Sequence, residues 1–192
     1  MNYNQNIKMQ KVIWIHSYTW NPDTWDFWPS MRKNLLESEI ELITPTFPES
    51  RTTEYLQWEK VLDKQDFSEV TKVIWHSLGT RVATEYIVKN NIKLERLLLV
   101  SPTITAKRSD WTDRFELIDF FPDYKFSDTY ARFDKLKDLV NEIIVIASLD
   151  DKAVPFQESQ DFAKMIWAKF IWTNWNWHFN AREYKILEEL IK

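Results

Sequence analysis

The chain has 192 residues and a formal net charge of −4 at pH 7, with 44% hydrophobic and 28% charged residues. These values are ordinary for a globular protein, predict a single domain over residues 1–192, and argue against nucleic acid or an anionic membrane as a partner. No cysteine is present, which excludes disulfide bonds, thiolate metal ligands and a cysteine nucleophile.

Short apolar runs alternate with helical patterns along the whole chain. The first six residues are polar, unlike a signal peptide, and no later stretch is long enough to span a membrane, so we expect a cytoplasmic protein. Strands are expected at residues 12–16, 40–44, 72–75, 96–100, 142–147 and 169–172, and helices at 27–37, 53–62, 79–89, 133–138, 156–166 and 181–191. This alternation predicts a three-layer α/β fold, in which a mostly parallel sheet of about six strands carries helices on both faces. Residues 104–130 interrupt the alternation and are expected to form a short lid.

The segment 75–79, Trp-His-Ser-Leu-Gly, stands where an expected strand passes into an expected helix. It resembles the nucleophile elbow G-x-S-x-G of α/β-hydrolases, in which a sharp turn exposes a serine, here Ser77. Tryptophan occupies the first glycine position of that pattern. Because strand and helix pass closely at this turn, a large side chain at position 75 is unexpected.

Acidic and histidine residues follow two later strands. Asp150 and Asp151 come after the strand expected at 142–147, and His178 comes after the one expected at 169–172. Functional side chains of parallel α/β sheets gather at the carboxyl ends of the strands, and the order Ser, Asp, His is that of α/β-hydrolase triads. A neutral imidazole would take the proton of the serine hydroxyl, while a carboxylate would fix the imidazole tautomer. A solvated turn before Pro155 is the alternative interpretation of the two aspartates.

On these motifs the chain resembles the compact α/β-hydrolases typified by the retinoblastoma-binding serine hydrolase and its small bacterial relatives. The resemblance extends over nearly the whole length and rests on residues 15–18, 21–22, 44–48, 76–79, 150–155 and 178–179. It implies that Ser77 is the nucleophile, His178 the base, and Asp151 the acid, with Asp150 as the alternative. It also implies an oxyanion hole formed by the backbone N–H groups of Leu78 and Tyr18. Neither a cofactor nor a metal is implied.

Glycine occurs once and tryptophan 11 times, although average usage predicts about a dozen glycines. Trp58 and Trp111 suit a helix and the expected lid. By contrast, five tryptophans occupy places where the family pattern or a turn favours glycine, namely Trp20, Trp75, Trp167, Trp175 and Trp177. We therefore hypothesise that several tryptophans are glycines in the cellular protein, as happens when a UGA codon for glycine is translated as tryptophan.

The sequence therefore predicts a serine hydrolase that cleaves a carboxylic ester or related acyl bond of a small molecule through an acyl-enzyme. In the chain as written, Trp75 and Trp177 are expected to disturb the site. His16 is expected to shape the oxyanion loop, His76 is expected to pack beside the nucleophile, and the three histidines lack the spacing of a metal site. The alternative is a catalytically impaired protein of the same fold that serves as a binding or scaffold module and holds a protein partner through its aromatic side chains.

Overall fold

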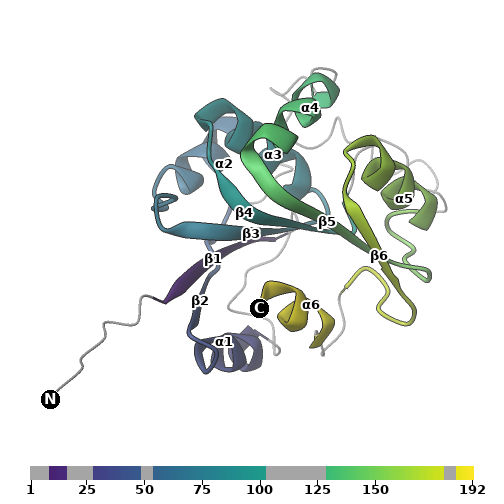
Figure 1. Ribbon diagram of the computed structural model, residues 1–192, viewed down its shortest axis with the longest axis horizontal. Coiled ribbons are helices and arrows are strands. Elements are labelled where there is room, and N and C mark those ends of the chain that lie inside the picture. Colours follow the sequence, from purple (N-terminus) through teal and green to yellow (C-terminus); the bar gives the residue numbers. More distant parts are fainter. Residues whose placement is uncertain (1–8, 17–27, 49–53, 103–128, 180–184) are drawn as a thin grey trace, which may run out of the picture.

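The computed structural model describes residues 9–16, 28–48, 54–102, 129–179 and 185–192. Strands and helices alternate throughout these ranges, as the apolar pattern predicts (Figure 1). In chain order the elements are β1 (Gln10–Ile15), α1 (Trp28–Leu36), β2 (Ile40–Ile43), α2 (Tyr55–Leu62), β3 (Val70–His76), α3 (Gly79–Asn90), β4 (Leu94–Val100), α4 (Thr129–Leu139), β5 (Val140–Ser148), α5 (Phe156–Met165), β6 (Lys169–Thr173) and α6 (Lys185–Ile191).

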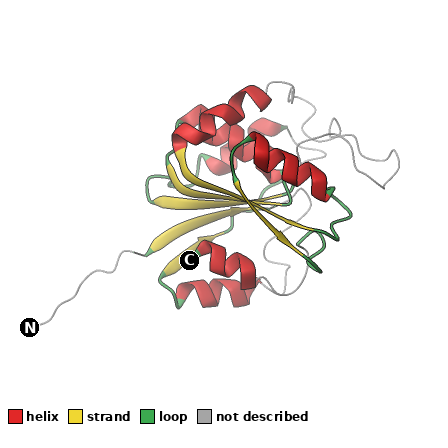
Figure 2. Ribbon diagram, turned by 45° about the vertical axis from the view of Figure 1, so that its right-hand side comes forward, coloured by secondary structure: helices red, strands yellow, loops and turns green. Residues whose placement is uncertain are grey.

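The strands form one parallel sheet in the order β2-β1-β3-β4-β5-β6. The central strands are continuous apolar runs because helices cover both of their faces. In β4, for example, residues 97–100 are all buried. Helices α2, α3, α4 and α5 pack on one face of the sheet, and α1 and α6 pack on the other (Figures 1 and 2). The predicted three-layer α/β fold is therefore confirmed.

Each predicted helix and strand is present, and the differences lie at the ends. Helix α4 begins at Thr129, four residues before the predicted start, and β5 extends over Val140–Ser148. Residues 104–128 of the expected lid lie outside the described residues, while residues 129–130 belong to α4. None of the helices in the described ranges has the length and apolar character that a membrane crossing needs.

The last helix is fixed to the middle of the sheet by two cationic side chains. Lys72 of β3 donates hydrogen bonds from Nζ to the carbonyls of Ile191 and Lys192, at 2.8 and 3.2 Å. Arg96 of β4 donates from Nη1 to the carbonyl of Leu190, at 2.7 Å. Cations at the carboxyl end of a helix satisfy its last carbonyls and its dipole. The apolar face of α6, with Leu187 and Ile191, is thereby held against the sheet.

The carboxyl ends of β3, β4, β5 and β6 lie side by side, which brings the residues that follow them to one edge. The N–H of Ser77 donates to the carbonyl of Val100, and the N–H of Ser101 donates to that of Ile146, both at 2.9 Å. These bonds extend the ladder by one residue beyond each strand. Side chains after four strands thus meet at this edge, where parallel α/β sheets bind their ligands.

Candidate active site

Ser77 occupies the turn between β3 and α3. Its φ of 53° lies in the left-handed region, which a non-glycine residue adopts at an energetic cost. Gly79 begins α3 so close to β1 that an added Cβ would lie 3.1 Å from the carbonyl oxygen of His16 and 3.2 Å from that of Ile15. The one glycine of the chain therefore stands where a Cβ would crowd the backbone of β1, and the serine stands on a sharp, constrained turn.

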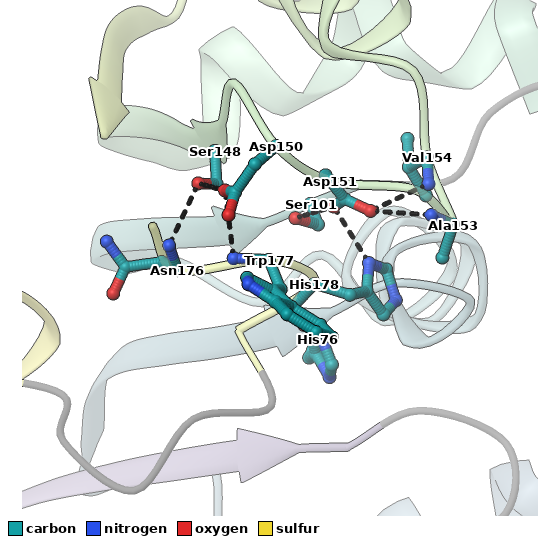
Figure 3. Close-up of polar contacts among 10 residues, drawn as sticks. All are labelled: His76, Ser101, Ser148, Asp150, Asp151, Ala153, Val154, Asn176, Trp177 and His178. Atoms are coloured by element: carbon teal, nitrogen blue, oxygen red, sulfur yellow. Dashed lines mark hydrogen bonds and ion pairs between the residues drawn. The ribbon is translucent and has the colours of Figure 1, made fainter. Parts of the chain in front are cut away.

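Asp151 follows β5 and is held by four hydrogen bonds (Figure 3). Its Oδ1 accepts from the backbone N–H groups of Ala153 and Val154, at 2.8 and 2.9 Å. Its Oδ2 accepts from the hydroxyl of Ser101 at 2.7 Å and lies 2.9 Å from Nδ1 of His178. With its side chain only 1% exposed, this carboxylate has a single, well-defined orientation.

The contact with Asp151 determines the tautomer of His178. A carboxylate only accepts hydrogen bonds, so Nδ1 of His178 carries the hydrogen and Nε2 of the neutral ring is left as a proton acceptor. The His178 side chain is 11% exposed, so the ring is largely buried at this edge of the sheet. The arrangement suits a general base whose orientation is set by a buried acid.

His76, the last residue of β3, connects the neighbourhood of Ser77 to His178. Its Nε2 lies 2.9 Å from the carbonyl oxygen of His178, and the two ring centroids are 4.7 Å apart. Burial lowers the pKa of His76 well below its usual value, and repulsion from the protonated forms of His178 and His16 lowers it further, against the opposing effect of the hydrogen bond. His76 is therefore neutral, and because a carbonyl only accepts, its hydrogen is on Nε2.

Asp150 has different partners from its neighbour. Its Oδ1 accepts the backbone N–H of Trp177 at 3.0 Å and the hydroxyl of Ser148 (Figure 3). Burial raises the pKa of Asp150, but hydrogen bonds from the Ser148 hydroxyl and from backbone N–H groups, that of Trp177 first, outweigh it, so the pKa lies below its ordinary value. The structure thus places Asp151 beside the imidazole of His178 and Asp150 beside the backbone that precedes it.

Two serines of this network were not among the predicted site residues. Ser101 follows β4 and donates to Asp151, while Ser148 ends β5 and donates to Asp150. Both stand directly after a buried apolar run, and this position at the end of a predicted strand is the sequence feature that could have identified them. Of the expected oxyanion donors, Leu78 lies next to Ser77 at the start of α3, and Tyr18 lies outside the described residues. The described residues contain no group of three or more metal-ligating side chains.

Five of the described tryptophans differ in environment, two being buried and three exposed. Trp58 is fully buried, and its indole N–H donates to the carbonyl of Pro48 at 2.8 Å. Trp75 is also buried, but its indole N–H has no hydrogen-bond partner among the described residues. Trp167, Trp175 and Trp177 have φ values of 54°, 67° and 48° and are 68%, 79% and 62% exposed. A positive φ is a genuine outlier for so bulky a residue and is ordinary for glycine.

A family model described as serine hydrolase matches residues 20–189. The chain belongs to this serine hydrolase family. A comparison with curated proteins found no match. Among solved structures, this serine hydrolase is similar to the ydeN gene product of B. subtilis, with a TM-score of 0.76 and 21% identity over 95% of this chain and 97% of that one.

Two further solved structures resemble this serine hydrolase at lower identity. Est1E from Butyrivibrio proteoclasticus matches with a TM-score of 0.66 and 16% identity, over 98% of this chain and 87% of that one. The monoacylglycerol lipase of Paleococcus ferrophilus matches with a TM-score of 0.70 and 11% identity, over 94% of this chain and 91% of that one. At these identities the likeness establishes the shared α/β-hydrolase fold.

Proposed function

We propose that this serine hydrolase cleaves a carboxylic ester or related acyl bond of a small molecule with Ser77 as nucleophile, His178 as base and Asp151 as acid. The observation that carries the proposal is the 2.9 Å contact between Nδ1 of His178 and the buried carboxylate of Asp151. Ser77 adds support, since it stands on the strained turn of the adjacent β3 end. The esterase and lipase among the similar folds are consistent with this chemistry.

The proposed reaction has two steps, acylation of Ser77 and hydrolysis of the acyl-enzyme. Nε2 of His178 takes the hydroxyl proton of Ser77 as Oγ bonds to the acyl carbon, and the resulting tetrahedral oxyanion accepts the N–H of Leu78 and, as the family resemblance implies, that of Tyr18. The imidazolium then gives its proton to the leaving alcohol as the C–O bond breaks. In the second step water attacks the acyl-enzyme, His178 takes a proton from that water, and the proton returns to Oγ of Ser77 as the acid leaves.

A fluorophosphonate probe tests the nucleophile directly. The intact mass should increase by one adduct, and Ser77→Ala should abolish the increase while leaving the fold unchanged. Asp151→Asn should lower the labelling rate by about 10³- to 10⁴-fold, because an amide does not hold the imidazole in the required tautomer. A folded protein that gives no adduct, both as written and with Trp75→Gly and Trp177→Gly, contradicts the proposed function.

We also propose that glycine stands at positions 75, 167, 175 and 177 in the protein that the cell makes. The left-handed backbone of Trp167, Trp175 and Trp177 supports this, as does the unsatisfied indole of Trp75. The codons decide the question: UGA at these four positions agrees with the proposal, and UGG contradicts it. In the chain as written, Trp75→Gly together with Trp177→Gly should increase the labelling rate, because they restore the expected glycine two residues before Ser77 and directly before His178.

The binding-module alternative rests on exposed aromatic side chains at the site edge. Trp172, Trp175 and Trp177 are 59–79% exposed, a distribution that favours contact with a protein or a flat ligand. Two of these three have the left-handed backbone that favours glycine, which weakens this alternative. Ser77→Ala separates the two functions, since it abolishes turnover in a hydrolase and leaves partner binding intact in a scaffold. The resemblance to the retinoblastoma-binding hydrolase stays a prediction.

A further inference from the structure

Residues 174–179, here called the base loop, follow β6 and carry His178. Three of them have a left-handed backbone, with φ of 67° at Trp175, 48° at Trp177 and 52° at Phe179. The N–H of Phe179 donates to the carbonyl of Asn176 at 2.8 Å, which closes a tight turn around His178. The hydrogen bond that Nδ1 of His178 donates to Asp151 orients the ring through one nitrogen, but it does not fix the backbone that carries the ring. The location of the ring therefore depends on what holds this turn.

Two side chains at the end of β5 hold the first half of the turn (Figure 3). The N–H of Asn176 donates to Oγ of Ser148 at 3.2 Å, and the N–H of Trp177 donates to Oδ1 of Asp150 at 3.0 Å. The hydroxyl of Ser148 donates its hydrogen to the same Oδ1 of Asp150. The lone pairs of Ser148 Oγ are therefore left to accept the N–H of Asn176. Each donor thus has a matching acceptor, and the carboxylate organises the pair.

A side chain at the end of β3 holds the second half. Nε2 of His76 donates to the carbonyl of His178 at 2.9 Å, and the two rings are in contact. His76 immediately precedes Ser77, so the strand that presents the nucleophile also binds the backbone of the base. Three consecutive residues of the base loop, 176 to 178, each have a backbone polar group bonded to a side chain from the strand ends.

We propose that Ser148, Asp150 and His76 are positioning residues that fix the base loop and thereby set the location of Nε2 of His178 relative to Ser77. This inference rests on the proposed role of His178 as the base. Asp151 sets the tautomer and tilt of the ring, and the three positioning residues set its place. The two adjacent aspartates therefore have separate tasks, one acting on the imidazole and the other on the peptide backbone that precedes it.

The test compares substitutions at the two aspartates, using p-nitrophenyl acetate and the fluorophosphonate probe. Asp150→Ala should lower kcat and the labelling rate by about 10- to 100-fold with little change in KM, because a displaced base slows the chemical step. Asp150→Asn keeps an acceptor oxygen for Ser148 and Trp177 and should recover activity to within about threefold of wild type. Asp151→Asn should stay inactive. Asp134→Ala, at an exposed aspartate of α4, is the matched control.

Amide hydrogen exchange gives a second measurement that does not depend on catalysis. The Trp177 N–H should exchange at least about tenfold faster in Asp150→Ala and stay protected in Asp150→Asn. If Asp150→Ala does not fold, Ser148→Ala gives the same comparison at the Asn176 N–H. The inference is overturned if these backbone N–H groups exchange at the wild-type rate in the alanine variants. It is also overturned if Asp150→Asn is as inactive as Asp151→Asn. A protein that is not labelled even with Trp75→Gly and Trp177→Gly refutes the proposed function and leaves exchange to decide the role of the positioning residues.

Discussion

Replacing the left-handed tryptophans by glycine should stabilise the protein, although the substitution removes a large side chain. Trp167, Trp175 and Trp177 are each more than half exposed, so their indoles contribute little buried area that could be lost. Trp172 provides a matched control, because it is 59% exposed and lies within strand β6, outside the set of residues with positive φ. The comparison therefore isolates the backbone conformation from the loss of the aromatic ring.

The expected magnitude follows from two opposing terms. A left-handed conformation costs a non-glycine residue about 1–2 kcal/mol, while glycine gives the unfolded chain extra entropy that costs about 0.5–1 kcal/mol. The net gain is then about 0.5–1 kcal/mol for Trp175→Gly or Trp177→Gly. Trp167→Gly should gain less, because Nζ of Lys137 lies 4.9 Å from the centroid of its ring and a cation–π contact contributes about 0.5 kcal/mol. Trp172 has no left-handed backbone to relieve, so Trp172→Gly keeps only the entropic cost of glycine. It should lower the free energy of unfolding by about 0.5–1 kcal/mol.

Urea titration followed by far-UV circular dichroism measures these free energies of unfolding. The triple variant at 167, 175 and 177 should be more stable by roughly 1–2 kcal/mol, which corresponds to about 2–8 °C in Tm for a chain of this size. Trp175 and Trp177 are neighbours, so their contributions need not add. If the three variants are destabilised as much as Trp172→Gly, the backbone argument for glycine at these positions is refuted.

Three further predictions concern individual side chains. Ser101→Ala removes one of the hydrogen bonds to Asp151 and should lower kcat by about tenfold, or about 1.4 kcal/mol of transition-state stabilisation, without changing KM; unchanged steady-state kinetics would contradict this. Trp58→Phe leaves the Pro48 carbonyl without its donor and should cost about 1–3 kcal/mol of stability, whereas a neutral result in urea would argue against a native tryptophan there. The pKa of buried His76 is lowered, so below about pH 6.5 the unfolded chain binds more protons than the folded one, and stability falls with acid. His76→Gln should therefore reduce the loss of stability between pH 6.5 and 5 by up to about 1.4 kcal/mol per pH unit, and parallel pH profiles would exclude the effect.

The sequence was sufficient to predict the order of elements because every central strand is a continuous apolar run and every helix has an apolar face. It also located the strand ends after which Ser77, Asp151 and His178 occur. The assignment of Asp151 and His178 as acid and base remains a prediction that labelling tests, although the structure places the two side chains in contact. Element boundaries were less predictable, since α4 starts within a segment whose pattern shows no clear period.

The supporting residues were not predictable from local pattern, because their roles depend on pairing between strands that are distant in sequence. Ser101 and Asp151 are 50 residues apart, and they meet because β4 and β5 are neighbouring strands that end at the same edge of the sheet. Ser148 and Asn176 meet for the same reason at the ends of β5 and β6. The separate roles of Asp150 and Asp151 likewise depend on the turn after β5, which points adjacent side chains at different targets.

The attachment of α6 to the centre of the sheet has a consequence for synthesis of the chain. Lys72 and Arg96, which bind the carbonyls at the end of α6, are made about one hundred residues before their acceptors. Until residues 185–191 have emerged from the ribosome, the apolar side chains of β1, β3 and β4 that pack against α6 lack that cover. The nascent chain therefore exposes this apolar face of the sheet until α6 has been made, and chaperone binding in the cell should concentrate on this face and end when α6 docks.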